Sequence, residues 1–395
     1  MDEQEVKRLE DSMQLHTYHK LPIVLERGEG VYLFDKSGKR YIDFMSAYGV
    51  AILGHSNVAV IEAVQNQMQK LISCHGSVYN EARAKLLSKL KLISPPDLQH
   101  FYLCNSGAEA IEAAMKFARK VRRKKGFIAF SGGYHGKTFG ALSVTWGEKY
   151  REPFAPLLDG VVFGRYGDVE QLEKLPFEEV AAVIVEPVQG ESGIKMANQE
   201  FFNTIQSRCK ETGCLMIVDE IQTGLGRTGK MWGHEHYALR PDIITVAKGI
   251  GGGIPLGVTM VSNKVAEAIE LGDHTTTFGG NPVAAAAGCA VIDFILSNRL
   301  IEHSRSLGKV FRERLAEMSN QKLYKESRNM GLMAALELRI KFMNVLDEAL
   351  KHGLITLYSG LNIIRMLPPL IISKEQLDEG LDILLQALKK TGENL

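Results

Sequence analysis

Short apolar runs that end in charged residues recur through the middle of the chain. Two of them lie in residues 215–253, where one run leads into Asp219 and Glu220 and the other leads into Lys248. Runs this short with polar residues at the exit predict buried strands of a parallel sheet. Because ligands gather at the carboxyl ends of such strands, we expect Asp219 and Lys248 to meet in one crevice.

The same pattern extends over about two hundred residues. After Pro95 and Pro96, apolar runs alternate with segments of helical period, and further strands are expected in HFYLC, GFIAF, VAAVIV and GVTMVS. Alternation of this kind predicts a mainly parallel sheet covered by helices on both faces. The fold class is therefore α/β.

The two ends of the chain have a different pattern. Residues 23–47 alternate between apolar and polar positions around glycine-containing turns, which predicts antiparallel strands. From about residue 291 the pattern is helical, followed by strands in GLMAALEL and IIRMLPP and a last helix from Lys374. We expect residues 1–50 and 293–395 to form one small α+β domain beside a large domain of residues 51–292.

Composition and charge exclude several classes of protein. The chain has 395 residues with 45% hydrophobic and 24% charged positions, as in ordinary globular proteins. Its net charge of +1 favours neither nucleic acid nor an anionic membrane as a partner. No apolar run reaches the roughly 18 residues of a membrane helix, and the charged N-terminal segment does not resemble a signal peptide. The five scattered cysteines form no Cys-x-x-Cys pair, so we expect a cytoplasmic protein without disulfides or structural zinc.

A lysine and an aspartate at neighbouring strand ends have a specific chemical use. A partly desolvated lysine amine becomes a nucleophile that can condense with an aldehyde. A carboxylate such as Asp219 can keep a pyridine nitrogen protonated, so that the ring withdraws electrons. These two tasks are the protein's share of pyridoxal phosphate (PLP) chemistry. On these two runs alone, an ordinary ion pair between Asp219 and Lys248 at the sheet edge stays an alternative.

Two loops could hold the other parts of such a cofactor. Residues 105–109 join a strand to a helix, and a glycine at a helix N-terminus suits a phosphate, although Ser106 could also be a plain cap. Tyr134 lies in a loop between glycines, where it could stack on a ring or cover the core.

Polar residues at further strand ends complete the candidate crevice. Glu186 and Glu191 follow the strand VAAVIV, and Gln222 follows Asp219 by three residues. The threonines of residues 275–277 could meet a phosphate or belong to a turn before the next helix. Arg365 is a lone arginine in an apolar strand, and a buried guanidinium needs a planar anion. Either a protein acid such as Glu191 or a substrate carboxylate supplies it.

Motifs for other chemistry are incomplete. The glycines of residues 249–253 match neither a nucleotide phosphate loop nor a dinucleotide fingerprint, and no G-x-S-x-G sequence occurs. His234 and His236 lack the further ligands that a metal needs, so we expect surface histidines and no metal site.

Taken together, these stretches resemble the class III PLP-dependent aminotransferases, and within them the acetylornithine/ornithine branch. The resemblance covers nearly the whole chain. It is carried by the combination of NSGAEA, GGYHGKTFGALSVT, VIVEPVQGESG, MIVDEIQTGLGRTGK, PDIITVAKGIGGGIPLG and TTTFGGNPVAAAA. It implies the fold type I of PLP-dependent transferases.

The resemblance also implies roles in cofactor binding. Lys248 would bind PLP covalently and move a proton, Asp219 would pair with the pyridine nitrogen, and Gln222 would contact the phenolic oxygen. The remaining cofactor contacts would come from Ser106, Gly107, Ala108, Tyr134, His135, Glu186 and Thr277. Because Thr277 would reach the phosphate of a neighbouring subunit, the resemblance implies a homodimer, alone or as a dimer of dimers.

The implied reaction moves the terminal amino group of an ornithine-type donor, N-acetylornithine first, to 2-oxoglutarate. It would run by ping-pong through pyridoxamine phosphate and give a semialdehyde and glutamate. Arg365 would hold the α-carboxylate of glutamate or 2-oxoglutarate, and Glu191 would mask this arginine when the ω-amine enters. Lys137, Tyr48 and Tyr79 would lie on the donor side.

One departure from the family pattern concerns the donor. The family has HGR followed by Ser or Thr where this chain has HGKT, so Lys137 replaces an arginine. Lysine keeps the charge but cannot form a bidentate fork with a carboxylate. Putrescine, free ornithine, 4-aminobutyrate and a lysine or ornithine precursor carried on an acidic protein are therefore alternative donors. Arg365 argues against a glutamate-semialdehyde aminomutase, and Lys248 with Asp219 argues against a binding protein without cofactor.

Overall fold

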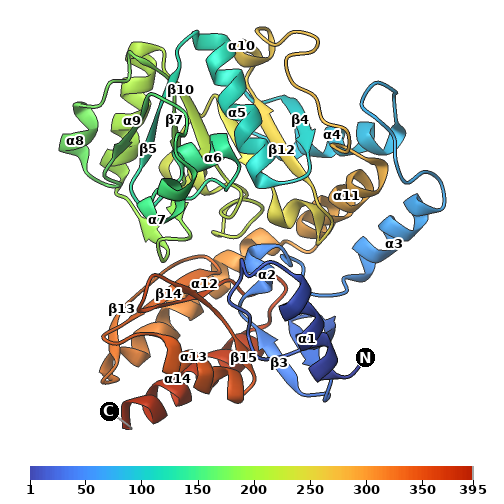
Figure 1. The fold of residues 1–395 in the computed structure, drawn as a ribbon, viewed down its shortest axis with the longest axis vertical. Helices are drawn as coiled ribbons and strands as arrows, with labels where there is room; N and C mark the ends of the chain where they lie inside the picture. The colour runs from blue at the N-terminus through green and yellow to red at the C-terminus, as the bar shows by residue number, and fades with distance from the viewer. Residues whose placement is uncertain (394–395) are drawn as a thin grey trace.

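The computed structural model describes residues 1–393, and its larger part is built on one seven-stranded sheet (Figure 1). The strands have the order β4-β12-β11-β10-β7-β5-β6. They are β4 (His100–Cys104), β5 (Gly126–Phe130), β6 (Val161–Gly164), β7 (Val180–Val185), β10 (Leu215–Asp219), β11 (Ile243–Val246) and β12 (Gly257–Val261). Only β12 runs antiparallel to its neighbours, so the predicted mainly parallel mixed sheet is confirmed.

Both faces of this sheet are buried, because successive side chains of a strand point to opposite faces. In β5, Phe127 and Ala129 pack in the apolar cluster that contains helix α5 (Gly107–Arg122). The alternate residues of the same strand, Ile128 and Phe130, pack on the opposite face, in the apolar cluster that contains helix α9 (Gln199–Thr212). The strands therefore read as continuous apolar runs and deliver polar residues only at their ends.

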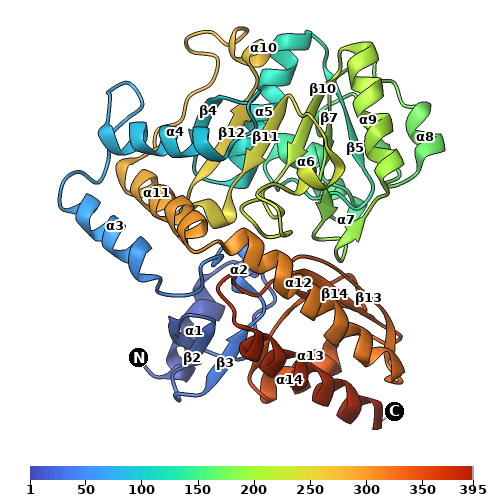
Figure 2. The ribbon, with the colours of Figure 1, turned by 180° about the vertical axis from the view of Figure 1, so that it is seen from behind.

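Segments from both ends of the chain lie together beside this sheet, in the lower lobe of Figures 1 and 2. One small sheet has the order β1-β2-β3-β15 and the other β13-β14-β17-β16. The strands are β1 (Leu25–Glu29), β2 (Tyr32–Asp35), β3 (Arg40–Asp43), β13 (Tyr324–Met330), β14 (Met333–Leu338), β15 (Leu354–Ile355), β16 (Leu357–Ser359) and β17 (Ile363–Met366). Leu354 of β15 lies opposite Ile42 of β3 in a parallel pair, which joins the two ends of the chain in one sheet.

The remaining elements cover these sheets or connect them. They are α1 (Glu3–Met13), α2 (Ser46–Gly49), α3 (Val58–Met68), α4 (Glu81–Ile93), α6 (Phe139–Val144), α7 (Glu148–Arg151), α8 (Val169–Glu173), β8 (Val188–Gln189), β9 (Lys195–Met196), α10 (Asn263–Ala266), α11 (Pro282–Ser297), α12 (Leu300–Glu317), α13 (Met343–Lys351) and α14 (Lys374–Glu393). The expected domain boundary between residues 292 and 293 falls inside α11, and the domain boundaries stay a prediction.

Across residues 1–393 no single helix is long and apolar enough to span a membrane. Helix α11 and the helical segment Leu300–Asn320 would together have the length and composition of a broken span, but the pair is bent by 63°.

Candidate active site

The parallel strands β10 and β11 bring Asp219 and Lys248 to one cavity. Asp219 ends β10 opposite Thr245 of β11, and Lys248 follows β11 by two residues. Both side chains line a cavity of about 440 Å³. It is lined by Val50, Asn105, Ser106, Gly107, Ala108, Tyr134, His135, Gly136, Lys137, Glu186, Glu191, Asp219, Ile221, Gln222, Ala247, Lys248, Gly253, Ile254, Pro255 and Leu256. Most of the site residues expected from sequence therefore meet at one place.

Lys248 is prepared for reaction by its backbone and by its surroundings. Its φ angle is +51°, a left-handed conformation that costs a residue with a side chain about 1–3 kcal/mol. Burial lowers the pKa of its amine below the usual 10.5, against the opposing charge of Glu191. A lowered pKa increases the fraction of neutral amine, which is the nucleophilic form.

Asp219 is held in a fixed orientation by two hydrogen bonds. His135 Nδ1 lies 2.7 Å from its Oδ2, and the Ile221 N–H donates to its Oδ1 at 3.0 Å. Burial of His135 disfavours its charged form, but the bond to Asp219 and the charge of that carboxylate outweigh burial and raise the pKa of His135. The His135 ring therefore fixes the direction of the Asp219 carboxylate in the cavity wall.

Glu186 organises the loop that carries Tyr134 and His135. Its carboxylate accepts the N–H of Tyr134 at 3.0 Å and the N–H of Gly190 at 3.3 Å. Burial raises the pKa of Glu186 to about 7. Tyr134 lines the cavity from this loop, so Glu186 fixes one wall of the site in addition to lining it.

The N-terminus of α5 points its first turn at the same cavity. Ser106 caps the helix by accepting the Glu109 N–H at 3.2 Å. The next backbone amides, at Gly107 and Ala108, have no partner within a helix and suit a phosphate. A Cβ on Gly107 would lie 2.8 Å from Ile221 Cδ1, which explains the glycine here.

One polar atom in the cavity wall lacks a partner. The Oε1 of Gln222 is buried and has no hydrogen-bond donor among residues 1–393. A Cβ on Gly190 would lie 1.9 Å from this oxygen, so the glycine leaves the amide its space. The cavity therefore brings together four groups that match the polar groups of PLP. They are the Lys248 amine, the Asp219 carboxylate, the Gln222 amide with its unpaired oxygen, and the N-terminus of α5.

Arg365 and Glu191 form an ion pair at the edge of the site. Arg365 lies in β17, is 0% exposed, and its Nη1 is 2.8 Å from Glu191 Oε1. Its Nε and Nη2 are buried without a partner among the described residues. Burial opposes the charge of Glu191, but Arg365 and Lys248 outweigh it and lower the pKa of this carboxylate. Of the two partners that the sequence left open for Arg365, this structure shows the protein acid.

Five of the expected residues lie at the rim of the cavity or outside it, and one of them is Arg365, which is not among the residues that line it. Lys137 lines the rim with an exposed side chain, 4.9 Å from the ring centre of Tyr150. Tyr48 does not line the cavity, but its ring centre lies 5.8 Å from the Arg365 guanidinium. Thr277 and Tyr79 are exposed and do not line the cavity of their own chain.

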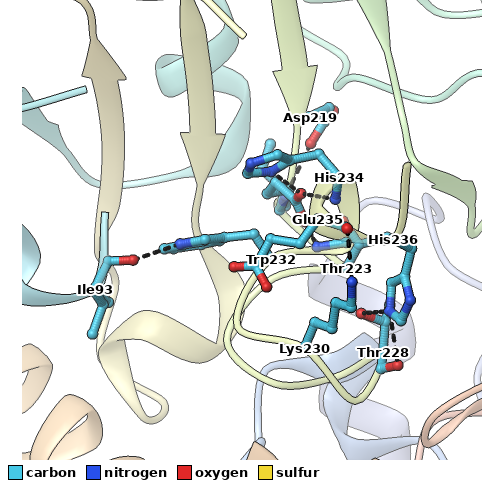
Figure 3. A network of polar contacts seen from close by, with 12 residues as sticks. Ile93, Asp219, Thr223, Thr228, Lys230, Trp232, His234, Glu235 and His236 are labelled. Atoms are coloured by element: carbon cyan, nitrogen blue, oxygen red, sulfur yellow. Dashed lines mark hydrogen bonds and ion pairs between the residues drawn. The ribbon is translucent and has the colours of Figure 1, made fainter. Parts of the chain in front are cut away.

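Sequence reasoning missed a buried network behind Asp219 (Figure 3). The Glu220 carboxylate accepts the Gly233 N–H at 2.9 Å, the His234 N–H at 2.7 Å and the Thr223 hydroxyl, and His234 Nδ1 lies 2.9 Å away. The expectation that His234 lies on the surface is wrong, because it is 3% exposed. The sequence did carry a signal for this network, because Glu220 directly follows Asp219. Two successive side chains of a strand point in opposite directions, so Glu220 points away from the cavity and needs a buried partner. Within residues 1–393 no group of three or more His, Cys, Asp or Glu residues is placed to hold a metal ion.

Comparison with known proteins agrees with this geometry. Residues 13–388 match the family model described as aminotransferase class-III. The acetylornithine aminotransferase of Methanopyrus kandleri is 42% identical over 98% of this chain and 100% of its own. The [LysW]-aminoadipate semialdehyde/glutamate semialdehyde transaminase of Sulfolobus acidocaldarius is 40% identical over 96% of this chain and 97% of its own. The crystal structure of the ornithine aminotransferase from Toxoplasma gondii superimposes with a TM-score of 0.96 at 27% identity, covering 100% of this chain and 97% of that one.

Proposed function

This chain belongs to the class III aminotransferases, which depend on PLP, and from that premise we propose that it acts on the terminal amino group of an ornithine-type donor. N-acetylornithine is the first choice, since similar proteins from several organisms are acetylornithine aminotransferases. The acceptor is 2-oxoglutarate, and the products are a semialdehyde and glutamate. Each substrate enters the same cavity in turn.

The residues around the cavity fit PLP, which when bound supplies an aldehyde and an electron-withdrawing ring. We assign Lys248 to the covalent bond and Asp219 to the pyridine nitrogen. The α5 N-terminus at Ser106, Gly107 and Ala108 would hold the phosphate. Tyr134 would lie against the ring, and the Gln222 amide would face the phenolic oxygen.

Lys248 would also carry the proton that the reaction moves. Its lowered pKa leaves a neutral amine that would take a proton from the donor carbon bonded to the nitrogen and return it to the carbon on the other side of that nitrogen. His135 orients the Asp219 carboxylate at the other end of the site, where a carboxylate next to the ring nitrogen would favour its protonated form.

The observation that carries the assignment is the Arg365–Glu191 ion pair. Glutamate and 2-oxoglutarate have a carboxylate beside the reacting carbon, whereas the terminal amine of an ornithine-type donor has none. One cavity that accepts both needs a cation that is available for the first substrate and neutralised for the second. Arg365 provides the cation, and Glu191, at 2.8 Å, neutralises it until a substrate carboxylate takes its place.

The variant Glu191→Gln tests this exchange. Without the carboxylate, the buried Arg365 guanidinium keeps its charge but has no protein acid beside it. We expect the half-reaction with glutamate to keep its rate or accelerate, and the half-reaction with N-acetylornithine to slow by about tenfold or more. Single-turnover absorbance of the bound cofactor measures both rates, with the exposed Glu200→Gln as control. Equal changes in the two half-reactions would contradict the exchange.

Lys137 favours a second class of donor. Its ammonium and that of Lys149 lie 4.9 Å and 4.6 Å from the ring centre of Tyr150. Two flexible cations at an exposed rim can be reached by an acidic protein that carries the substrate. Relatives from two archaea are [LysW]-aminoadipate semialdehyde/glutamate semialdehyde transaminases. A carrier-linked lysine or ornithine precursor is therefore the alternative, and free ornithine, putrescine and 4-aminobutyrate complete the donor panel.

Lys137→Arg tests the role of this position. Arginine binds a carboxylate through two parallel hydrogen bonds, so we expect kcat/KM for N-acetylornithine to rise several-fold relative to that for putrescine. Lys149→Arg on the same tyrosine ring is the matched control. An unchanged ranking of the donors would mean that Lys137 does not contact the donor.

We infer that the enzyme acts as a homodimer, alone or as a dimer of dimers. Thr277 and Tyr79 are exposed and lie outside the cavity of their own chain. In a dimer they would reach the neighbouring cavity, with Thr277 at the phosphate and Tyr79 at the donor. The scattered cysteines support a cytoplasmic location.

A further inference from the structure

We propose that a second pocket, lined by α12, β13 and the segment of residues 228–236, binds a small oxyanion with two or more charges, such as a diphosphate. The pocket has a volume of about 540 Å³, within the usual range for small-molecule sites. It shares no lining residue with the cofactor cavity. No step of the aminotransferase reaction uses it.

One face of α12 supplies the positive charge. Arg305, Lys309 and Arg312 are four and three residues apart and line the pocket together, because side chains at this spacing share a helix face. None of the three has a carboxylate within 4.0 Å among residues 1–393. In a chain with a net charge of only +1, three cations without acids at one concave place create a local positive field.

The two arginines are already oriented for an anion. Arg305 Nε donates to the Gly229 carbonyl at 2.9 Å, and Arg312 Nε donates to Asn329 Oδ1 at 3.2 Å. Their terminal nitrogens have no protein acceptor in the described part of the chain. A guanidinium anchored through Nε keeps two parallel donors for a phosphate or carboxylate, at a reduced cost in side-chain entropy.

The opposite wall of the pocket is polar and carries no carboxylate among its lining residues. His236 Nε2 lies 3.1 Å from both the carbonyl and the hydroxyl oxygen of Thr228 (Figure 3). Burial and the charge of Lys230 lower the pKa of His236, against the opposing hydrogen bond to Thr228 and the charge of Glu220. His236 and the Thr228 hydroxyl therefore add polarity to this wall without adding a carboxylate.

The acidic residues of β13 and β14 form ion pairs with cations other than those of α12. Arg328, which also lines the pocket, pairs with Glu326 and lies 3.1 Å from Glu337 Oε2. Its Nε donates to the Gly193 carbonyl at 2.6 Å. Glu326 and Glu337 thus compensate Arg328 and leave Arg305, Lys309 and Arg312 without a carboxylate counterion. The hollow shape between three elements favours a small anion over a flat acidic protein surface.

Calorimetric titration of the PLP-loaded enzyme with pyrophosphate tests the proposal, and citrate distinguishes phosphate from carboxylate ligands. We expect one saturable site per chain, weaker binding as KCl is added, and an unchanged cofactor absorbance spectrum. Arg312→Gln should weaken binding about tenfold or more, as loss of a charged hydrogen bond does. Arg305→Gln with Arg312→Gln should remove it. The exposed Lys341→Gln is the control.

Several results would overturn the proposal. One is the absence of saturable binding of either anion at millimolar concentration. Another is an equal loss of affinity in Lys341→Gln, which would indicate general charge attraction. Displacement of PLP by pyrophosphate would place the anion in the cofactor cavity. Binding of polyglutamate alone, with neither small anion bound, would assign the pocket to an acidic protein. Because all readouts are independent of the amine donor, failure here leaves the proposed function intact.

Discussion

Lys248 is the residue at which backbone, burial and chemistry meet. Its left-handed φ of +51° is unusual for a lysine. The following Gly249 has no space for a side chain, since a Cβ there would lie 2.9 Å from Ile52 Cδ1. Tight packing after β11 therefore holds the lysine in its strained conformation and directs the amine into the cavity.

Lys248→Ala should abolish turnover, by at least about a thousandfold, because the variant loses both nucleophile and proton carrier. The thermal unfolding midpoint should change by only a few degrees, since no hydrogen bond within the protein is lost. Steady-state kinetics measures the first effect, with the exposed Lys264→Ala as control. Borohydride reduction should attach the cofactor to a peptide that contains Lys248 in the wild type only. Ordinary rates in Lys248→Ala would remove this lysine from the mechanism.

Glu186 should make stability depend on pH. Burial raises its pKa from 4.5 to about 7, so the native state binds this proton more tightly than the unfolded state does. The stabilisation is complete below pH 4.5 and is lost as the pH rises through 7. The quantity to compare is the free energy of unfolding of the cofactor-free wild type minus that of Glu186→Gln. This difference should fall as the pH rises from 4.5 through 7.

Urea unfolding in buffers that span the interval measures the difference between the two proteins. The exposed Glu179→Gln, directly before strand β7, is the control and should follow the wild type at every pH. A constant difference between wild type and Glu186→Gln would show that Glu186 has an ordinary pKa.

Among the elements, the segment that follows β10 links the cofactor cavity to the body of the protein. It begins with Asp219 and carries Gln222 into the cavity wall, and it continues through a series of turns to Trp232, whose indole N–H donates to the Ile93 carbonyl at 2.6 Å. The Glu220 carboxylate, at the start of this segment, accepts the N–H groups of Gly233 and His234, which directly follow its end. The segment is therefore held from its buried side.

Glu220→Gln should loosen the whole segment. A glutamine offers only one acceptor oxygen to the backbone amides of Gly233 and His234 and turns an NH₂ group toward other donors. We expect a loss of about 2–4 kcal/mol in the free energy of unfolding and weaker PLP binding, because Asp219 and Gln222 flank the mutated residue. Urea unfolding and PLP titration measure the two effects, with the exposed Glu313→Gln on α12 as control. Unchanged PLP affinity would show that the segment does not position the cofactor residues.

On the scale of the whole molecule, exposed apolar side chains gather near the end of α3 and the start of α11. Met68, Ile72 and Phe278 line a groove of about 290 Å³, and Phe278 is 65% exposed. An exposed apolar cluster of this kind is typical of a protein interface. It adjoins Thr277, the residue that we expect to serve the neighbouring subunit.

Phe278→Asp should dissociate the proposed dimer. A charge in the centre of an apolar interface stays desolvated without a partner and costs several kcal/mol. Sedimentation velocity should show a shift toward monomer, and PLP binding should weaken because the Thr277 hydroxyl no longer reaches the phosphate. Leu361→Asp, 69% exposed in the small sheet region, is the control and should stay dimeric. A dimer that survives in Phe278→Asp would place the interface elsewhere.

The sequence by itself determined the parts of this protein that depend on local order. Apolar runs with a polar exit predicted the strands β10 and β11, and parallel strands must deliver Asp219 and Lys248 to the same edge. Glycine before a helix predicted the N-terminus of α5 in the same way. These features follow from backbone geometry within a few residues, so they could be predicted without knowledge of the rest of the chain.

Tertiary structure alone decided which distant side chains meet. Glu191 rather than another anion pairs with Arg365, 174 residues further along the chain, and no local pattern specifies that contact. His234 was expected on the surface but is buried against Glu220, because packing of the turns after β10 determines its exposure. The cations of α12 likewise face a hollow only once α12 packs beside β13. Burial and pairing depend on the whole fold, whereas strand ends and helix caps depend on their neighbours in sequence.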